Sequence, residues 1–362
     1  MSTPPARTPR RRWPWVAGAA LAVLLGAALA VRSFFDAERV AALVLEQAGQ
    51  ATGLQWTASG PAQVGLFPQL GVELSGLAVR APADAPILTA VGVEFALPWR
   101  TLFEEEVTVT GADLQQPVLD LRAWSRWRAS LPEQGPPGPI ELPHITGGVS
   151  VTDGQIVSGD WQLVEIALDA GTLRAGRRFE LELDGVLQRN DARHDFSLSV
   201  NTIPSTPAGA LELGDLGLLL APRDGGEPWL EANGRFGLRL PTPVELTLSG
   251  RLARWPPQWP GLLPASDPPQ APRFDLEYLG TPDLQGDLVF ALHRGAESLR
   301  GRFALGDVAG WLTDPQATPL PPATGQLEAG RLVFDTIQLQ GVRVRLDSGD
   351  DEPAGDAPQA EP

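Results

Sequence analysis

The chain has 362 residues, enough for one large domain or two ordinary ones. Its 28 basic residues are all arginine and face 44 acidic residues, and the resulting net charge of −16 excludes a nucleic-acid partner, which requires clustered positive charge. Cysteine is absent, which excludes a disulfide framework, a thiolate nucleophile and a thiolate metal site.

The amino-terminal segment combines a basic flank with the only long apolar run in the chain. Residues 1–12 hold a cluster of arginines and no acidic residue, and residues 13–31 carry no charge. The apolar run approaches the ~20 residues that a helix needs to cross ~30 Å of hydrocarbon. We therefore expect a cytoplasmic basic tail at 1–12 and a transmembrane anchor in the inner membrane at 13–31. The positive-inside rule places the rest of the chain in the periplasm.

Two details of this segment bear on the anchor. Trp13 and Trp15 lie between the arginines and the apolar run, where aromatic residues meet a membrane interface, and they are our first membrane-interface candidates. Ala28-Leu29-Ala30 supplies the small residues that signal peptidase prefers, so cleavage after Ala30 is the alternative to a retained anchor.

An amphipathic helix follows the anchor directly. Apolar residues recur at helical spacing between Ala37 and Ala51. Asp36 has the side chain of an N-cap, and Gly53 is a residue type that ends helices. The expected apolar stripe consists of Val40, Leu43, Val44, Ala48 and Ala51.

From Leu54 almost to the end, the apolar residues alternate with polar ones, which is typical of strands with one apolar face. Parallel strands covered by helices on both faces would not show this pattern, so we expect an antiparallel sheet. Its apolar face must be covered by another sheet, by closure of the sheet on itself, or by something other than protein. The clearest inward positions are Phe179, Leu181, Leu183, Phe196, Leu198, Val200, Val244, Leu246 and Leu248.

Two proline-rich segments, 132–143 and 256–272, interrupt the alternation and are expected to divide the sheet into three parts. The acidic tail lacks large apolar residues, so we expect it to be disordered. The expected divisions are a helix plus sheet at 32–131, a central sheet at 144–254, a carboxy-terminal sheet at 273–346 and a tail at 347–362.

Residue patterns that carry chemistry are absent from the sequence. The only histidines, His144, His194 and His293, are far apart and form no metal-binding pair. There is no nucleophile elbow, and without lysine there is no phosphate-binding loop of the usual kind. Most carboxylates fall at outward positions of the alternating strands or in the tail. We therefore predict no catalytic residue, no cofactor and no metal, and we expect that the protein is not an enzyme.

One short segment combines cationic and aromatic side chains. "LRAWSRWRASL" interleaves Arg122 and Arg126 with Trp124 and Trp127. These four residues are membrane-interface candidates, because tryptophan suits the interface and arginine binds lipid phosphate. The alternative is that the two tryptophans, three positions apart, dock a short helix on the sheet.

The order of the segments resembles the amino terminus of the AsmA family. The resemblance rests on the anchor, the helix "DAERVAALVLEQAGQATG" and the following "PAQVGLFPQLGVELSGLAV", in which Leu66, Phe67 and Pro68 match the family's L-F-P turn. It extends through "ALPWRTLFEEEVTVTGADLQQPVLDLR" to about Arg122. The closing segment "LEAGRLVFDTIQLQGVRVRLDSG" is also similar to the family's last strands.

The resemblance implies an inner-membrane protein of a Gram-negative periplasm, built as a long curved antiparallel sheet whose concave side is an apolar groove for phospholipid acyl chains. The nine inward positions given above are then lipid-groove candidates. The implied role is phospholipid transport or outer-membrane lipid homeostasis and assembly, with other periplasmic or outer-membrane assembly proteins as candidate partners. The alternative function is a periplasmic scaffold or secretion-apparatus subunit, with a closed β-sandwich and no lipid cargo.

Overall fold

The structure is a computed structural model of the chain. No helix among its described residues is long and apolar enough to cross a membrane. The predicted tail and anchor, with Trp13, Trp15 and Asp36, lie outside these residues, as do the tail at 347–362 and Leu66, Phe67 and Pro68. The described residues are 37–65, 70–82, 85–98, 110–131, 139–140, 142, 144–159, 161–189, 192–239, 244–253, 270–281, 286–295, 297–305, 324–334 and 337–346.

The chain is mainly β, as the alternation predicts, with few helices. The helices are α2 (Ala37–Thr52) and α3 (Leu121–Ser130), with a short 3-10 turn at Pro207–Gly209. The strands of the first half are β1 (Gln55–Ala58), β2 (Gln63–Gly65), β3 (Leu70–Arg80), β4 (Pro86–Leu97), β5 (Gly111–Gln115), β6 (Val118–Asp120), β7 (Gly148–Ser158), β8 (Trp161–Ala170) and β9 (Phe179–Arg189). Those of the second half are β10 (Ala192–Ser205), β11 (Leu211–Ala221), β12 (Leu230–Leu238), β13 (Val244–Leu252), β14 (Arg273–Gly280), β15 (Gly286–Arg294), β16 (Glu297–Ala304), β17 (Thr324–Phe334) and β18 (Ile337–Leu346).

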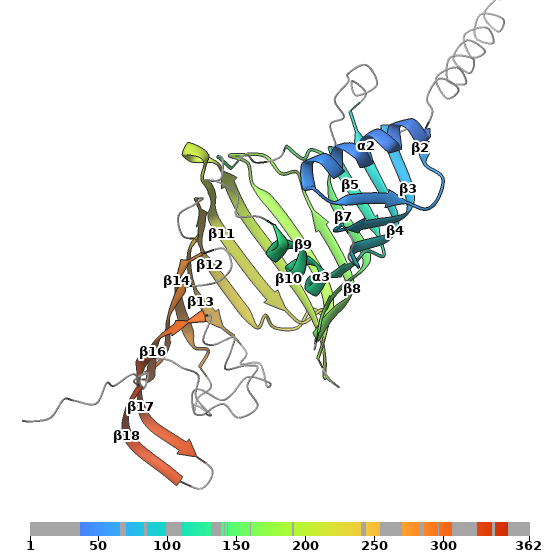
Figure 1. Cartoon of the computed structure of the whole chain (residues 1–362). Helices are drawn as coiled ribbons and strands as arrows, with labels where there is room; N and C mark the ends of the chain where they lie inside the picture. The colour runs from blue at the N-terminus through green and yellow to red at the C-terminus, as the bar shows by residue number, and fades with distance from the viewer. Residues whose placement is uncertain are drawn as a thin grey trace, which may run out of the picture.

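All strands belong to one 18-stranded sheet that follows the chain order (Figure 1). At the amino-terminal edge, β1 and β2 pair with different parts of β3. Next come β4 and then β5 and β6, which pair side by side with β4. From β7 to β18 each strand pairs with the next one in the chain.

The expectation of a purely antiparallel sheet is wrong at one place. β7 runs parallel to both β5 and β6, whereas the other pairs are antiparallel. Antiparallel neighbours can be joined by a tight turn, but parallel ones need a long crossover. The chain between β6 and β7, which contains α3, is that crossover. It returns the chain so that β7 begins at the same end of the strands as β5 and runs in the same direction.

The proline-rich segments do not divide the sheet. β7 pairs with β5 and β6 across the first segment, and β13 pairs with β14 across the second, from Val244 opposite Gly280 to Arg251 opposite Arg273. The described strands therefore form one continuous surface. The alternative of two sheets packed face to face is not found among them.

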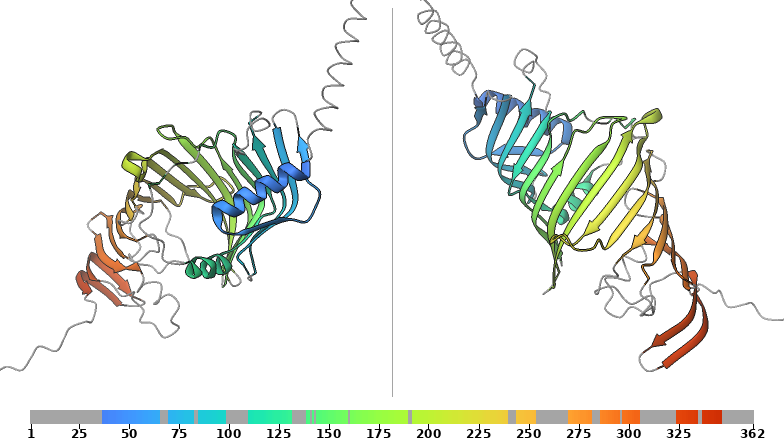
Figure 2. Two further views of the ribbon diagram at one scale, coloured as in Figure 1. Left: turned by 45° about the horizontal axis from the view of Figure 1, so that its top comes forward. Right: turned by 180° about the vertical axis from the view of Figure 1, so that it is seen from behind.

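The sheet is curved, and both helices lie on its concave side, while the view from behind shows the convex side free of helices (Figure 2). α2 packs against β1, β2 and β3, and α3 packs against β4 and β7. The helices therefore cover the amino-terminal part of the concave face.

α2 confirms the predicted amphipathic helix. It ends at Gly53, whose φ of 70° and hydrogen bond from its N–H to the carbonyl of Gly49 are typical of a glycine that terminates a helix. Ala41 and Val44 are buried, and Leu45 packs beside them. Val44 is therefore buried as predicted, and Ala41 and the half-buried Leu45 also lie on the packed side. The side chains of Val40, Leu43 and Ala51 lie outside the described part of the chain.

The main core lies between the helices and the first strands. Leu54, just after α2, and Ala123, in α3, contact side chains of β3 and β4 there. Leu45 and Phe95 pack against both buried clusters of this region, so the clusters are continuous. The buried members are Ala41, Leu54, Val72, Leu74, Leu77, Val79, Ala81, Ile87, Ala90, Val93, Leu97 and Ala123.

Glycines in β12 and β13 allow the backbones of the two neighbouring strands to approach closely. A Cβ at Gly250 in β13 would overlap the carbonyl of Glu231 in β12, and a Cβ at Gly234 in β12 would overlap the carbonyl of Thr247 in β13. Both glycines lie on the concave side, where bending brings side chains together. Without side chains at these positions the strand pair can bend inward.

Candidate functional site

A continuous row of apolar residues runs along the concave face, perpendicular to the strands. Each member pairs directly with the next across the sheet, from β3 to β18, and of these strands only β6 does not contribute. We call it the apolar row: Val72, Phe95, Ala112, Val149, Ala170, Leu181, Val200, Leu218, Ala232, Gly250, Phe274, Leu292, Leu299, Leu327 and Val344.

A second row on the same face consists only of leucines. It crosses β8 to β13, two residues along each strand from the apolar row, so that the two rows form a continuous apolar strip. We call it the leucine row: Leu168, Leu183, Leu198, Leu220, Leu230 and Leu252.

The apolar row begins in the helix-covered core and continues beyond it. Val72 is fully buried beneath α2, and Phe95 packs on the same clusters. The residues next to the row face the convex side and are polar: Glu73, Glu94 and Asp113 are consecutive partners there, and all three are exposed. The sheet therefore separates an apolar concave face from a polar convex one.

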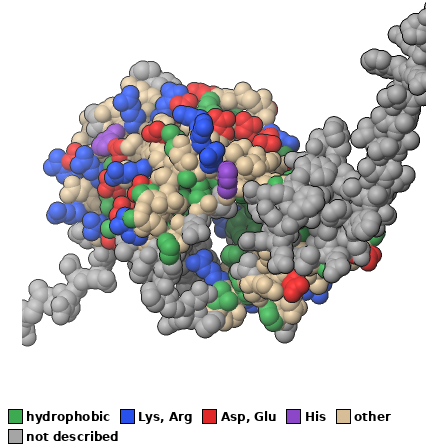
Figure 3. Space-filling model, turned by 90° about the horizontal axis from the view of Figure 1, so that it is seen from above, with side chains coloured by type: hydrophobic (Ala, Val, Ile, Leu, Met, Phe, Trp, Pro, Cys, Tyr) green, Lys and Arg blue, Asp and Glu red, His purple; other side chains and the backbone are tan. Residues whose placement is uncertain are grey.

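All nine lipid-groove candidates lie on the concave face. Leu181 and Val200 belong to the apolar row, and Leu183 and Leu198 to the leucine row. Val244 is buried, whereas the other eight are half-buried. Seen from above, the molecule is hollowed, and hydrophobic side chains show inside the hollow (Figure 3).

Two places on this face are filled by its own side chains. In β12 to β15, Ala232, Leu252, Phe274 and Leu292 form a buried cluster, and half-buried side chains of β11 and β16 pack against it. In β10, the ring of Phe196 lies over its partner Gly185, where an added Cβ would be 3.3 Å from the ring. The concave face is thus closed in parts and half-exposed between them.

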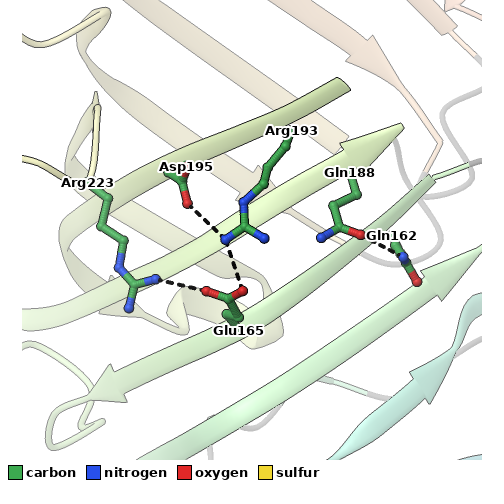
Figure 4. A network of polar contacts seen from close by, with 6 residues as sticks. All are labelled: Gln162, Glu165, Gln188, Arg193, Asp195 and Arg223. Carbon is green, nitrogen blue, oxygen red and sulfur yellow. Dashed lines mark hydrogen bonds and ion pairs between the residues drawn. The ribbon is translucent and has the colours of Figure 1, made fainter. Parts of the chain in front are cut away.

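The convex face carries a network of ionic contacts near the start of β10 (Figure 4). Arg193 donates to Glu165 at 3.0 Å and lies 3.5 Å from Asp195, while Arg223 lies 3.7 Å from Glu165. The hydrogen bond with Glu165 is the main cause of the raised pKa of Arg193. Because these side chains are about half exposed, solvent screens the contacts and they contribute little to stability.

The titratable side chains that the structure describes do not have the geometry of a metal site. Within the described ranges, no three His, Cys, Asp or Glu side chains are grouped so that they could hold a metal ion. The arginines of the Figure 4 network are paired with carboxylates, so the network balances its own charge. His144, His194 and His293 lie in separate parts of the sheet and its connections.

The cationic and aromatic segment forms α3, and its two tryptophans lie in different surroundings. Trp127 packs against the core, and the buried Ala123 lies on the same side of the helix. Trp124 is 39% exposed, with its ring centroid 5.0 Å from that of Trp127. Arg122 and Arg126 are exposed. One side of α3 therefore packs, and the other presents cationic and apolar groups.

Asp120 holds the start of α3. Its carboxylate accepts hydrogen bonds from the N–H groups of Arg122 and Ala123, at 2.8 and 2.9 Å. We expect Asp120→Ala to cost about 1 kcal/mol of unfolding free energy, because these donors lose their partner. Asp120→Ser, which retains a capping oxygen, should cost less. Denaturant unfolding of both variants measures the difference, and equal losses would contradict the capping role.

Sequence reasoning missed part of the concave face. Leu163 and Leu187 pair with each other on this face. The alternation in β8 is broken by a bulge, where the pairing shifts between Val164 and Ala167 and Glu165 has a φ of 54°. The short apolar run around Leu163 could have indicated this position, but it does not alternate strictly with polar residues.

Comparison with protein-family models, with curated proteins and with solved structures finds no match for this chain.

Proposed function

We propose that the protein binds phospholipid acyl chains along the concave face of its sheet and takes part in moving phospholipids between membranes. The observation that supports this best is the uninterrupted apolar row, which passes from the helix-covered core to the last strand. A sheet that only had to support itself would need a protein cover over this row. The described helices contact β1 to β4 and β7.

The energetics favour an apolar ligand on this face. Eight of the nine groove candidates are half-buried, so each leaves apolar surface in contact with solvent. Covering such surface is worth about 25 cal/mol per Å². An acyl chain lying across several strands gains this energy without a specific contact, which suits a surface along which lipid slides.

The proposal includes the setting implied by the AsmA resemblance: a single amino-terminal anchor in the inner membrane, a periplasmic body and a role in outer-membrane lipid supply. A periplasmic scaffold is the competing function. The convex face, with its exposed carboxylates and ion pairs, would serve such a role equally well.

Native mass spectrometry of the full chain, extracted in a mild detergent, tests the proposal. We expect phospholipid to copurify in stoichiometric amounts and to remain bound through gentle removal of the micelle. A mass corresponding to the chain alone, with circular dichroism showing the expected sheet, would contradict lipid binding and favour the scaffold.

A further inference from the structure

We infer that the outward side of α3 binds the headgroup of the lipid, and that the protein therefore prefers anionic phospholipids. This rests on the proposed function and names the cargo class of the same site. Three exposed arginines, Arg122, Arg126 and Arg128, lie within three helical turns, and α3 contains no acidic residue. In a chain with a net charge of −16, this is a local concentration of positive charge.

The place of α3 in the fold connects this charge to the groove. Leu119, just before α3, packs against the core beneath the helix and pairs with Ile156 in β7. Ile156 pairs with Leu163, and Leu163 pairs with Leu187 in β9. A row of apolar side chains thus runs along the concave face from beneath α3. A phospholipid with its acyl chains over Leu163 and Leu187 would have its phosphate next to α3.

The residues on the outward side of α3 are not needed for packing the helix on the sheet. Ala123 and Trp127 make the contacts with the core. Trp124, Arg128 and the following Leu131 recur at intervals of four and three residues and so share one face, on which all three are exposed. The guanidinium group of Arg122 occupies the space above Gly159 in the turn between β7 and β8. Arginine beside exposed tryptophan and leucine is the composition that binds lipid phosphate at an interface.

Among the described residues, the two apolar rows of the concave face add no charge of their own near this place. The apolar row and the leucine row contain no charged residue from β7 to β13. Exposed carboxylates such as Glu180 and Glu182 in β9 face the convex side, because they alternate with Leu181. Acyl chains on this face would therefore be held without regard to headgroup, and α3 would supply the discrimination.

The test uses the full chain in a zwitterionic detergent, offered equal amounts of phosphatidylglycerol and phosphatidylcholine, with bound lipids identified by native mass spectrometry. We expect a preference of about tenfold for phosphatidylglycerol, which follows from roughly a fivefold gain for each arginine near an anionic group, partly screened by solvent. The variant R122Q/R126Q/R128Q should lose the preference but still bind lipid.

Two further variants control for the total charge of the protein and for the charge on α3. R174Q/R177Q/R178Q removes the same charge from exposed arginines in the connection between β8 and β9, and it should keep the preference. R122K/R126K/R128K keeps the charge on α3 and should also keep it. Lipid bound without a headgroup preference, or a preference unchanged in the α3 glutamine variant, would overturn this inference and leave lipid binding intact. Absence of any lipid on the unmodified chain would overturn the proposed function as well.

Discussion

We expect the double substitution Leu218→Gln and Leu220→Gln to remove most of the bound lipid, while Leu219→Gln leaves it in place. The three leucines are consecutive in β11. Leu218 belongs to the apolar row and Leu220 to the leucine row, so both face the concave side. Leu219 faces the convex side and is 37% exposed. The variants therefore make the same chemical change on opposite faces of one strand.

The size of this effect follows from the surface that an acyl chain would cover. Leu218 and Leu220 are half-buried, so each has roughly half of its side chain available, worth about 1 kcal/mol in contact with an apolar ligand. Losing both weakens binding by about 2 kcal/mol, or roughly thirtyfold, before the cost of covering two amides. Lipid content after purification, measured by mass spectrometry, gives the comparison.

The alternative function makes a different prediction for the double variant. If the concave face were a dry core, the Leu218 and Leu220 variant would unfold, and Leu219→Gln would be neutral. Circular dichroism separates the cases, because loss of lipid from a folded sheet supports the groove. Full lipid retention by the folded double variant would show that the lipid lies elsewhere.

The sequence predicted the faces of regular strands but not their long-range pairing. In β9, β10 and β13 the alternation is unbroken, so Leu181, Leu198 and Leu246 were assigned to a common face, which the register confirms. The spacing within one strand says nothing about its neighbour. The parallel pairing of β7 with β5 and β6 depends on where the crossover through α3 returns, and no local pattern records that.

The two helices show the same limit: the sequence predicts that one side is buried, but not which residues at its border make contact. The helical period predicted that one stripe of α2 would be buried, yet Ala41 and Leu45 also pack against the strands, because the period does not record which flank of the stripe the neighbouring strands contact. For α3, the sequence left packing and interface roles as alternatives for Trp124 and Trp127. The structure assigns packing to Trp127 and exposure to Trp124, a division that depends on the position of Ala123 against the sheet.

The curvature of the sheet is the feature on which the groove depends, and the sequence marked it only by recurring glycines. A flat sheet with the same alternation would offer lipid a plane, whereas a coiled one surrounds it on several sides. Two such glycines lie in β12 and β13, where Gly250 pairs with Ala232 and Gly234 pairs with Leu248. Substitution there therefore tests whether the glycines set the shape.

We expect Gly250→Ala to lower the free energy of unfolding by about 3 kcal/mol, at the upper end of the cost of overpacking. The added Cβ would overlap the carbonyl of Glu231 and come within 2.8 Å of the Cα of Ala232. Both are backbone atoms that no change of rotamer can move, so β12 and β13 must separate. Separation breaks the hydrogen bonds between the two strands in the middle of the sheet.

Gly237→Ala is the matched control, because Gly237 lies in β12 but a Cβ there would have its nearest neighbour, the Cβ of Glu245, at 3.9 Å. This ordinary contact should change stability by no more than about 1 kcal/mol. Denaturant unfolding followed by far-ultraviolet circular dichroism compares the two variants. A similar small change in both would mean that β12 and β13 can separate at little cost, and the coil would then have to be held by the apolar contacts of Phe274 and Leu292 on the concave side.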